Sequence, residues 1–206
     1  MKIIFSQKKR LYLITDRSVS GLSHSDMVRQ AVTSGIGIIQ LREKDMPKKQ
    51  LYKEAAYIRE LTLRYGITFI VNDYIDIACT VHADGVHLGQ DDMPLQEARK
   101  ILGEKSIIGI STHNLRQARK AQQEGADYIG FGPLFLTATK DAGKPKGVYA
   151  LRKIKRHITI PVVAIGGITP ENAFHVLRAG ADAVAVASAI LSGDIRERVK
   201  KFMNVV

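Results

Sequence analysis

Two aspartates follow short apolar segments of the chain at a spacing that suggests a metal site. Asp73 comes after the apolar run Thr68–Val71, and Asp92 comes after Gly85–Leu88. Mg²⁺ is bound by one or two carboxylates, with waters and phosphate oxygens in its remaining positions. Aspartates are also common caps of helices that begin two or three residues later. Taken singly, each residue leaves both interpretations open.

Three cations follow other apolar segments, and they favour the metal-site interpretation of the two aspartates over helix caps. Arg42 and Lys44 lie just after the run Gly37–Leu41, and Lys140 lies in the segment after Tyr128–Phe131. Arginine presents a planar fork to phosphate oxygens, whereas lysine acts as a point charge. Together with the two aspartates, these residues favour a site that binds a metal ion and neutralises a multiply charged leaving group such as diphosphate.

A second group of residues points to a phosphate. Gly166 and Gly167 let backbone N–H groups approach an anion, and Ser188 can donate a hydrogen bond near the start of the following helix. Thr137 and Thr139 add two hydroxyls to this region. We favour a phosphate pocket here over the alternative, a tight turn ahead of the next helix.

The segments that must position these residues alternate regularly. Continuous apolar runs, typical of strands covered on both faces, alternate with amphipathic helical stretches. Eight such pairs predict an α/β fold of the TIM (β/α)8 barrel type, in which functional groups lie at the carboxyl ends of the strands. A doubly wound open sheet is the alternative, but the turn after the first run lacks the expected glycines. The predicted strands are 11–15, 37–41, 68–71, 85–88, 107–110, 128–131, 161–165 and 183–187, and the clearest predicted helices are 48–65, 115–124, 170–179 and 190–203.

Length and composition predict one soluble domain over residues 1–206. The chain is 45% hydrophobic and 25% charged, which excludes a disordered or collagen-like protein. Its net charge is +11, but no aromatic residues interleave with the basic runs, so we expect no nucleic-acid surface. We also expect no membrane segment, a cytoplasmic location and a possible homodimer.

The remaining reactive side chains are weaker candidates. We expect His87 to be a packed histidine near the barrel mouth, and Cys79 to lie in the core. His113 follows a predicted strand, where it either contacts a substrate or starts a helix. No Ser-His-Asp or Cys-His arrangement emerges from the sequence.

Several ordered motifs resemble those of the thiamine-phosphate synthase family. The similarity extends from LYLITD at 11–16 to ASAI at 187–190, which is nearly the whole chain. The motifs between these ends are QLREK at 40–44, VND at 71–73, GVHLGQDD at 85–92, GIS ending at Ser111, GPLFLTATK at 132–140 and AIGGI at 164–168.

This resemblance implies a TIM barrel and a transferase of thiamine biosynthesis. The implied reaction joins a hydroxymethylpyrimidine diphosphate to a thiazole phosphate, and gives thiamine phosphate and diphosphate with Mg²⁺ as cofactor. Asp73 and Asp92 would hold the metal. The implied pyrimidine-diphosphate contacts are Gln40, Leu41, Arg42, Glu43, Lys44, Asn72, Ser111 and Lys140, and the implied thiazole-phosphate contacts are Thr137, Ala138, Thr139, Gly166, Gly167, Ala187 and Ser188.

Two other functions stay open at this point. A thiazole tautomerase is a related barrel that transfers a proton without metal or diphosphate, and His113 would be its natural acid or base. That enzyme has no use for the diphosphate-binding set, in which Arg42, Lys44 and Lys140 would be the catalytic cations. A non-catalytic regulator that binds nucleic acid through its net charge is the third possibility.

Overall fold

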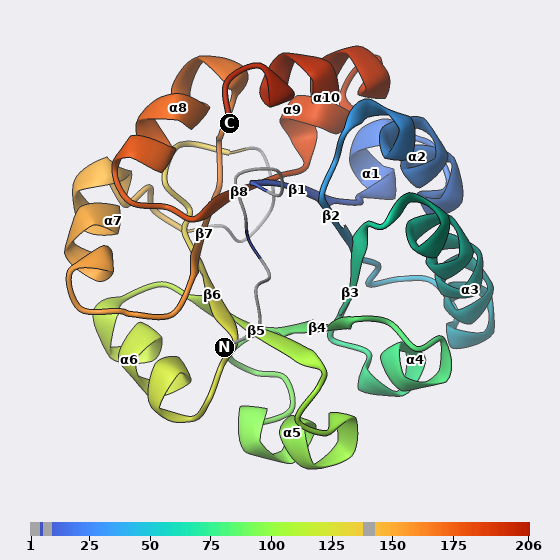
Figure 1. Cartoon of the computed structure of the whole chain (residues 1–206), viewed down its shortest axis with the longest axis horizontal. Helices are drawn as coiled ribbons and strands as arrows, with labels where there is room; N and C mark the ends of the chain where they lie inside the picture. The colour runs from blue at the N-terminus through green and yellow to red at the C-terminus, as the bar shows by residue number, and fades with distance from the viewer. Residues whose placement is uncertain (1–4, 6–9, 138–142) are drawn as a thin grey trace.

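Eight parallel strands close into a barrel in the computed structural model, which describes residues 5, 10–137 and 143–206. Each strand pairs with its neighbours in sequence, and β8 closes the ring by pairing with β1. Figure 1 shows the strands as an inner ring inside a ring of helices. The strands are β1 Leu11–Ile14, β2 Ile38–Leu41, β3 Thr68–Asn72, β4 Gly85–Leu88, β5 Ile107–Thr112, β6 Tyr128–Phe131, β7 Val162–Ile165 and β8 Ala183–Val186. The TIM-barrel prediction is confirmed, and the open-sheet alternative is wrong.

The helices follow the strands in alternation, with one departure from the predicted pattern. A single helix over 190–203 is expected, but the structure has α9 and α10 instead, because Ser192 and Gly193 separate them and Asp194 caps the second. Among the described residues no helix is long and apolar enough to cross a bilayer. The helices are α1 Arg17–Ser20, α2 His24–Ala31, α3 Lys48–Tyr65, α4 Ile75–Thr80, α5 Leu95–Leu102, α6 Leu115–Gln123, α7 Gly147–Lys155, α8 Pro170–Arg178, α9 Ser188–Leu191 and α10 Ile195–Met203, with a short 3-10 helix at Val32–Ser34.

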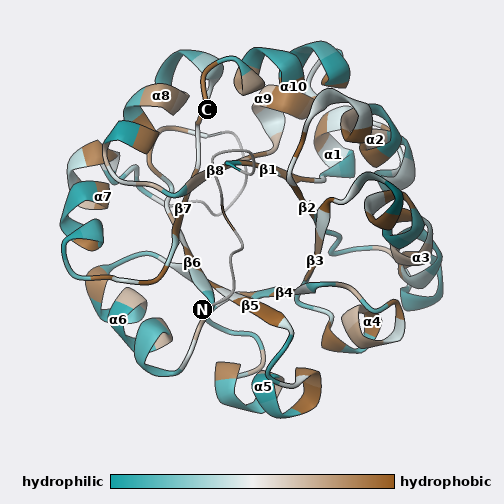
Figure 2. Cartoon of the chain, in the orientation of Figure 1, coloured by the Kyte–Doolittle hydropathy of each residue, from teal (hydrophilic) through white to brown (hydrophobic). Residues whose placement is uncertain are grey.

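The core has two layers because alternate strand residues point to opposite faces. Outward residues such as Leu13 and Phe69 pack between the strands and the helices. Inward residues such as Tyr12, Ile70 and Tyr128 fill the barrel itself. Figure 2 shows the corresponding hydrophobic colouring along the strands and on the inner sides of several helices.

The rings of Tyr128 and His87 fit inside the barrel because positions beside them are glycines. A Cβ atom on Gly109 would lie 2.1 Å from Cζ of the Tyr128 ring, and one on Gly130 would lie 3.2 Å from Cε1 of His87. These glycines occupy inward positions that would otherwise carry side chains into the same space. The interior of this barrel is therefore a packed layer with polar atoms in it, not an open pore.

Three aspartates anchor the amino-terminal end of the barrel in the same way. Asp84, Asp127 and Asp182 each directly precede an even-numbered strand. Each carboxylate accepts a hydrogen bond from a backbone N–H of the preceding strand and from a basic side chain of the helix that leads into that strand. The donors are Phe69 N and Arg59 for Asp84, Ile108 N and Arg99 for Asp127, and Val162 N and Lys155 for Asp182, at 2.6–3.0 Å.

Candidate active site

Two adjoining pockets open at the carboxyl ends of the strands. They share the side chains or backbone of Arg42, Thr137, Ile165 and Gly166, so they form one cup with two compartments. The first compartment is also lined by Asp16, Gly167, Ala187 and Ser188, and the second by Ser111, His113, Gly132 and Pro133. Among the residues predicted for the site, Arg42, Ser111, Thr137, Gly166, Gly167, Ala187 and Ser188 line this cup.

Asp73 and Asp92 lie side by side at the rim of this end. Burial raises the pKa of Asp73, and the neighbouring Asp92 carboxyl, within hydrogen-bonding reach, raises it further. Lys44 opposes both effects, because its Nζ atom lies 2.7 Å from Oδ2 of Asp73. Two carboxylates this close repel each other when both are charged, so the pair favours a bound cation.

Asp73 and Asp92 do not cap the helices that follow them, so the alternative interpretation of these aspartates is wrong. The residue that caps α4 is Tyr74 and that of α5 is Pro94, and neither helix receives a capping hydrogen bond from a side chain. Asp92 Oδ2 instead accepts the N–H of Gly89 at 2.6 Å. Asp73 itself has the left-handed backbone torsion φ = 61°, which is uncommon outside glycine.

The donor set at this rim fits a hard cation. Across residues 5, 10–137 and 143–206, no group of three or more His, Cys, Asp and Glu side chains is arranged to hold a metal ion. Asp73 and Asp92 are thus two carboxylates without a third His, Cys, Asp or Glu ligand among those residues. Mg²⁺ binds in this manner, with waters and substrate phosphates in its other positions.

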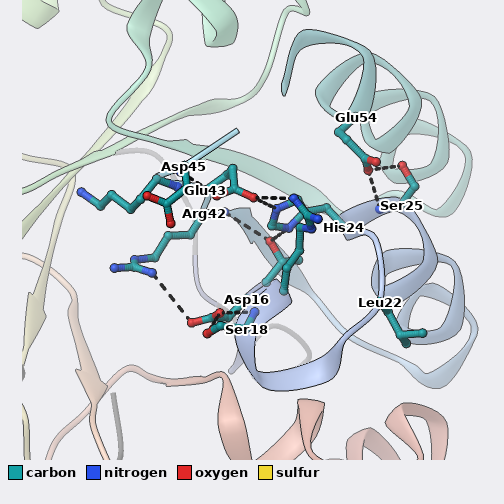
Figure 3. Close-up of polar contacts among 12 residues, drawn as sticks. Asp16, Ser18, Leu22, His24, Ser25, Arg42, Glu43, Asp45 and Glu54 are labelled. Carbon is teal, nitrogen blue, oxygen red and sulfur yellow. Dashed lines mark hydrogen bonds and ion pairs between the residues drawn. The ribbon is translucent and has the colours of Figure 1, made fainter. Parts of the chain in front are cut away.

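In the loop after β2, the side chains of Arg42 and Glu43 point in different directions (Figure 3), and the ammonium group of Lys44 pairs with Asp73. The Arg42 guanidinium borders both compartments and lies 3.8 Å from Asp16 Oδ2. Glu43 turns away and bonds His24 at 3.1 Å. Burial raises the pKa of Glu43, but hydrogen bonds from the N–H of Asp45, from His24 and from the N–H of Lys44 outweigh this effect and lower it to about 2.

Three of the implied contact residues lie on the strands next to this loop. Leu41 is 1% exposed, and its side chain packs in the outer core, so only its backbone faces the carboxyl end. Gln40 and Asn72 are at inward positions near the ends of β2 and β3, and both are buried. Asn72 is in register with His87 on the neighbouring strand.

A chain of hydrogen bonds runs beneath the cup, buried from Gln40 to Tyr128 and partly buried at His87 and Ser111. Gln40 Nε2 donates to the Tyr12 hydroxyl at 2.7 Å, and that hydroxyl lies 2.9 Å from the hydroxyl of Tyr128. His87 Nδ1 is 2.9 Å from the Tyr128 hydroxyl, and its Nε2 is 2.9 Å from Ser111 Oγ. Burial lowers the pKa of His87 to about 4, so the imidazole is neutral at pH 7. The prediction of a packed histidine is confirmed.

Gly166 and Gly167 pack closely against the loop that follows β6. A Cβ atom on Gly166 would lie 2.5 Å from Cβ of Pro133, and one on Gly167 would lie 2.4 Å from the carbonyl oxygen of Leu136. Both have positive φ, at 96° and 63°. Glycine is therefore required for the turn and for its contact with the loop after β6, and the same turn borders the compartment that contains Ser188.

Part of the predicted site lies outside the described residues. Ala138, Thr139 and Lys140 belong to the segment 138–142, which the structure does not describe. Thr137 precedes this segment and lines both compartments.

Sequence reasoning missed several residues of the site. Thr15 and Asp16 directly follow β1, the one strand end to which it assigned no role, and their position was the available signal. Tyr12 and Tyr128 occupy inward positions of runs interpreted as uniformly apolar. Cys79 was expected in the core, but it is exposed on α4, so that expectation is wrong.

The closed barrel, with a glycine-lined cup, cations and paired carboxylates at the carboxyl end of its strands, defines an enzyme of the (β/α)8-barrel class. The family model described as thiamine monophosphate synthase matches residues 11–190. The thiamine-phosphate synthase of Chloroflexus aurantiacus is 49% identical over 187 residues, which cover 90% of this chain and 86% of that protein. The chain belongs to the thiamine monophosphate synthase family.

Two further relatives are similar to this chain over nearly their full length. The thiamine-phosphate synthase of Clostridium novyi is 48% identical over 199 residues, covering 95% of this chain and 98% of that protein. Among solved structures, the thiamine phosphate pyrophosphorylase of Pyrococcus furiosus is similar, with a TM-score of 0.90 and 40% identity over 97% of this chain and 96% of that one. The family resemblance expected from the motifs is confirmed.

Proposed function

We propose that this chain is a transferase that makes thiamine phosphate. It condenses 4-amino-2-methyl-5-(diphosphooxymethyl)pyrimidine with thiazole phosphate and releases diphosphate. The observation that carries this proposal is the rim at which Asp73, Asp92 and Lys44 meet beside a two-compartment cup. Family membership over residues 11–190 supports it independently.

The chain's own residues stabilise the departing diphosphate. As the bond between the pyrimidine methylene carbon and the diphosphate oxygen breaks, its electron pair stays on that oxygen. Arg42 and Lys44 stabilise this growing negative charge, and we assign the same role to Lys140 from the family resemblance. The electron-rich pyrimidine ring supports the positive charge left on the methylene, and the thiazole nitrogen then forms the new bond.

We assign Mg²⁺ to Asp73 and Asp92 because their paired carboxylates fit a hard cation. When bound, the ion supplies Lewis-acid stabilisation to the diphosphate oxygens. Lys44 connects the metal-binding carboxylates with the diphosphate, since its ammonium group pairs with Asp73 and its side chain is half exposed to solvent at the rim. It is thus placed to bind an anion that also binds the metal.

We assign the thiazole phosphate to the compartment lined by Gly166, Gly167, Ala187 and Ser188. Loops after the seventh and eighth strands commonly bind phosphate in these barrels. Thr137 borders this compartment, and Ala138 and Thr139 join it by the family resemblance. The common wall formed by Arg42 and Ile165 would hold the two substrates next to each other, which favours reaction by positioning.

The proposal also includes the substrate class, the cellular location and the oligomeric state of the enzyme. Its substrates are phosphorylated small molecules, and we expect a cytoplasmic homodimer that does not bind nucleic acid. The thiazole tautomerase alternative is not favoured, because the curated relatives compared are named as synthases.

The decisive experiment supplies both precursors and Mg²⁺ and follows diphosphate release and thiamine phosphate formation. We expect stoichiometric formation of both products, and no turnover after the metal is removed with a chelator. Isomerisation of the thiazole phosphate alone, without metal, would instead identify a tautomerase.

A further inference from the structure

A buried histidine outside the cup connects to the loop that carries the cations. His24 is the first residue of α2, and its side chain is fully buried. Its Nδ1 lies 2.8 Å from Thr15 Oγ1 and its Nε2 lies 3.1 Å from Glu43 Oε2. Both ring nitrogens are therefore satisfied, as buried polar atoms generally are.

Glu43 uses all its acceptor positions within the protein. Its Oε2 atom faces His24 and also Arg17, whose Nη1 lies 3.4 Å away. Its Oε1 atom accepts the backbone N–H of Lys44 at 2.7 Å and that of Asp45 at 2.9 Å. A carboxylate has about four lone-pair positions, so this one has none left for a substrate. Its negative charge would also repel a diphosphate.

The other side of the imidazole reaches the beginning of the same loop. Thr15 is fully buried, and its Oγ1 atom accepts the backbone N–H of Arg42 at 3.2 Å. His24 therefore joins two hydrogen-bonded links, one that ends on the backbone of Arg42 and one that ends on the backbone of Lys44.

The directions of these hydrogen bonds follow from the charges. Burial lowers the pKa of His24, so the ring is neutral at pH 7, and Glu43 is ionised. Nε2 then carries the proton and donates to Glu43, while Nδ1 at 2.8 Å accepts the Thr15 hydroxyl proton in preference to the Gln40 carbonyl oxygen, which lies 3.3 Å from Oγ1. With its proton directed at His24, Thr15 Oγ1 presents a lone pair to the Arg42 N–H.

The helix that holds His24 is itself fixed on both sides. The hydroxyl of Ser23 accepts the N–H of Asp26 and caps the helix. The N–H and hydroxyl of Ser25 both donate to Glu54 on α3, at 2.7 and 2.5 Å. Figure 3 shows His24 between this anchored helix start and the loop with Arg42 and Glu43.

We propose that His24, Thr15 and Glu43 are positioning residues that hold the backbone of Arg42 and Lys44 so that both cations face one diphosphate. This inference rests on the proposed function, and it changes the role of Glu43 from a substrate contact to a support of the loop. The three residues act through Arg42 and Lys44 and touch no substrate. Small displacements of groups that position a substrate can cost large factors in rate.

Binding of inorganic diphosphate in the presence of Mg²⁺, measured by calorimetry, tests the inference apart from turnover. We expect His24→Leu and Thr15→Val, which break different links, each to raise the dissociation constant about tenfold, with His24→Gln closer to wild type because its amide can still donate to Glu43. In the steady state, the KM for the pyrimidine diphosphate should rise more than the KM for the thiazole phosphate, because Lys44 does not line the thiazole-phosphate compartment. Thr15→Val keeps the shape of the side chain, so it tests the inference even if His24→Leu does not fold.

Asp127→Asn is the matched control, because it breaks a similarly buried contact at the opposite end of the barrel. It should lower the melting temperature without changing diphosphate affinity. If folded His24→Leu or Thr15→Val binds diphosphate as wild type does, the inference is wrong and the proposed function stands. If diphosphate affinity falls in the variants as expected but the wild-type protein forms no thiamine phosphate from the precursors, the proposed function is wrong instead. A wild-type protein that binds no diphosphate would overturn both.

Discussion

The ammonium group of Lys44 and the carboxylate of Asp73 form an ion pair of 2.7 Å between the loops that follow β2 and β3. Lys44 is half exposed, whereas Asp73 is largely buried beside Asp92. The lysine thus neutralises part of the charge of the carboxylate pair and still presents ammonium protons at the rim. Its position connects the metal-binding and anion-binding parts of the proposed site.

Replacing Lys44 with alanine should lower kcat for thiamine phosphate formation by about 100-fold, because one cation that stabilises the leaving group is lost. Diphosphate release at saturating substrates and Mg²⁺ measures the effect. Lys48→Ala is the matched control, since Lys48 forms a pair of similar length, 2.8 Å, with the exposed residue Asp76. Equal rates in the two variants would contradict the role of Lys44.

Asp73→Asn and Asp92→Asn should each raise the Mg²⁺ concentration for half-maximal activity by about tenfold or more, because each removes an anionic ligand. Titration of activity with Mg²⁺ measures this shift. Asp91→Asn changes an exposed neighbour and should leave the metal requirement unchanged. An unchanged Mg²⁺ titration for both variants would show that the ion binds elsewhere.

Stability toward acid should depend on His24. Burial lowers the pKa of His24 in the fold below its ordinary value of 6.5, so the unfolded chain takes up this proton first as the pH falls. The contribution of His24 to the free energy of unfolding is therefore complete above pH 6.5 and is lost below it. For Glu43, whose pKa is about 2 in the fold, the stabilisation is present above pH 4.5 and is lost as the pH falls toward 2.

Urea unfolding of wild type and His24→Gln between pH 8 and pH 5 measures the first of these effects. The stability difference between them should shrink as the pH falls through 6.5, because only wild type loses the contribution of the buried imidazole. His157→Gln, at an exposed position, should run parallel to wild type. A constant difference for His24→Gln would refute the prediction.

Asp127→Asn should destabilise the barrel by about 2–3 kcal/mol, because Arg99 loses its buried ionic partner. For a chain of this size that corresponds to a melting temperature lower by roughly 5–10 °C. Thermal unfolding measures the change, and kcat and both KM values should match wild type at a temperature where the variant is folded. A change in the kinetic constants would show that this end of the barrel is coupled to the cup.

Much of the fold is predictable because each parallel strand is covered on both faces and each helix has local boundary signals. The helix Lys48–Tyr65 begins after Pro47 and ends at Gly66, where the left-handed torsion φ = 64° suits glycine. The boundary between α9 and α10 is harder, because it spans only Ser192, Gly193 and Asp194 before apolar residues resume at Ile195.

The sequence predicts where the site lies in the barrel better than it predicts which side chains contact one another there. Strand ends place Asp73 and Asp92 at the same rim, but the left-handed backbone of Asp73 has no sequence signal. Glu43 belongs to a motif that predicts a substrate contact, and only the positions of His24 and Thr15 in space reveal its internal partners. Contacts between residues from different βα units depend on the closed barrel and cannot be assigned from spacing.

The hydrogen-bonded tyrosines beneath the cup have a consequence for how a substrate is oriented. Burial raises the pKa of Tyr12 and of Tyr128, and it lowers that of His87, so these three groups carry no charge at neutral pH. Ionic groups such as Arg42 and Lys44 are confined to the loops above them. A molecule with an anionic tail and an uncharged aromatic head is therefore favoured with its head toward these neutral groups and its tail toward the cations.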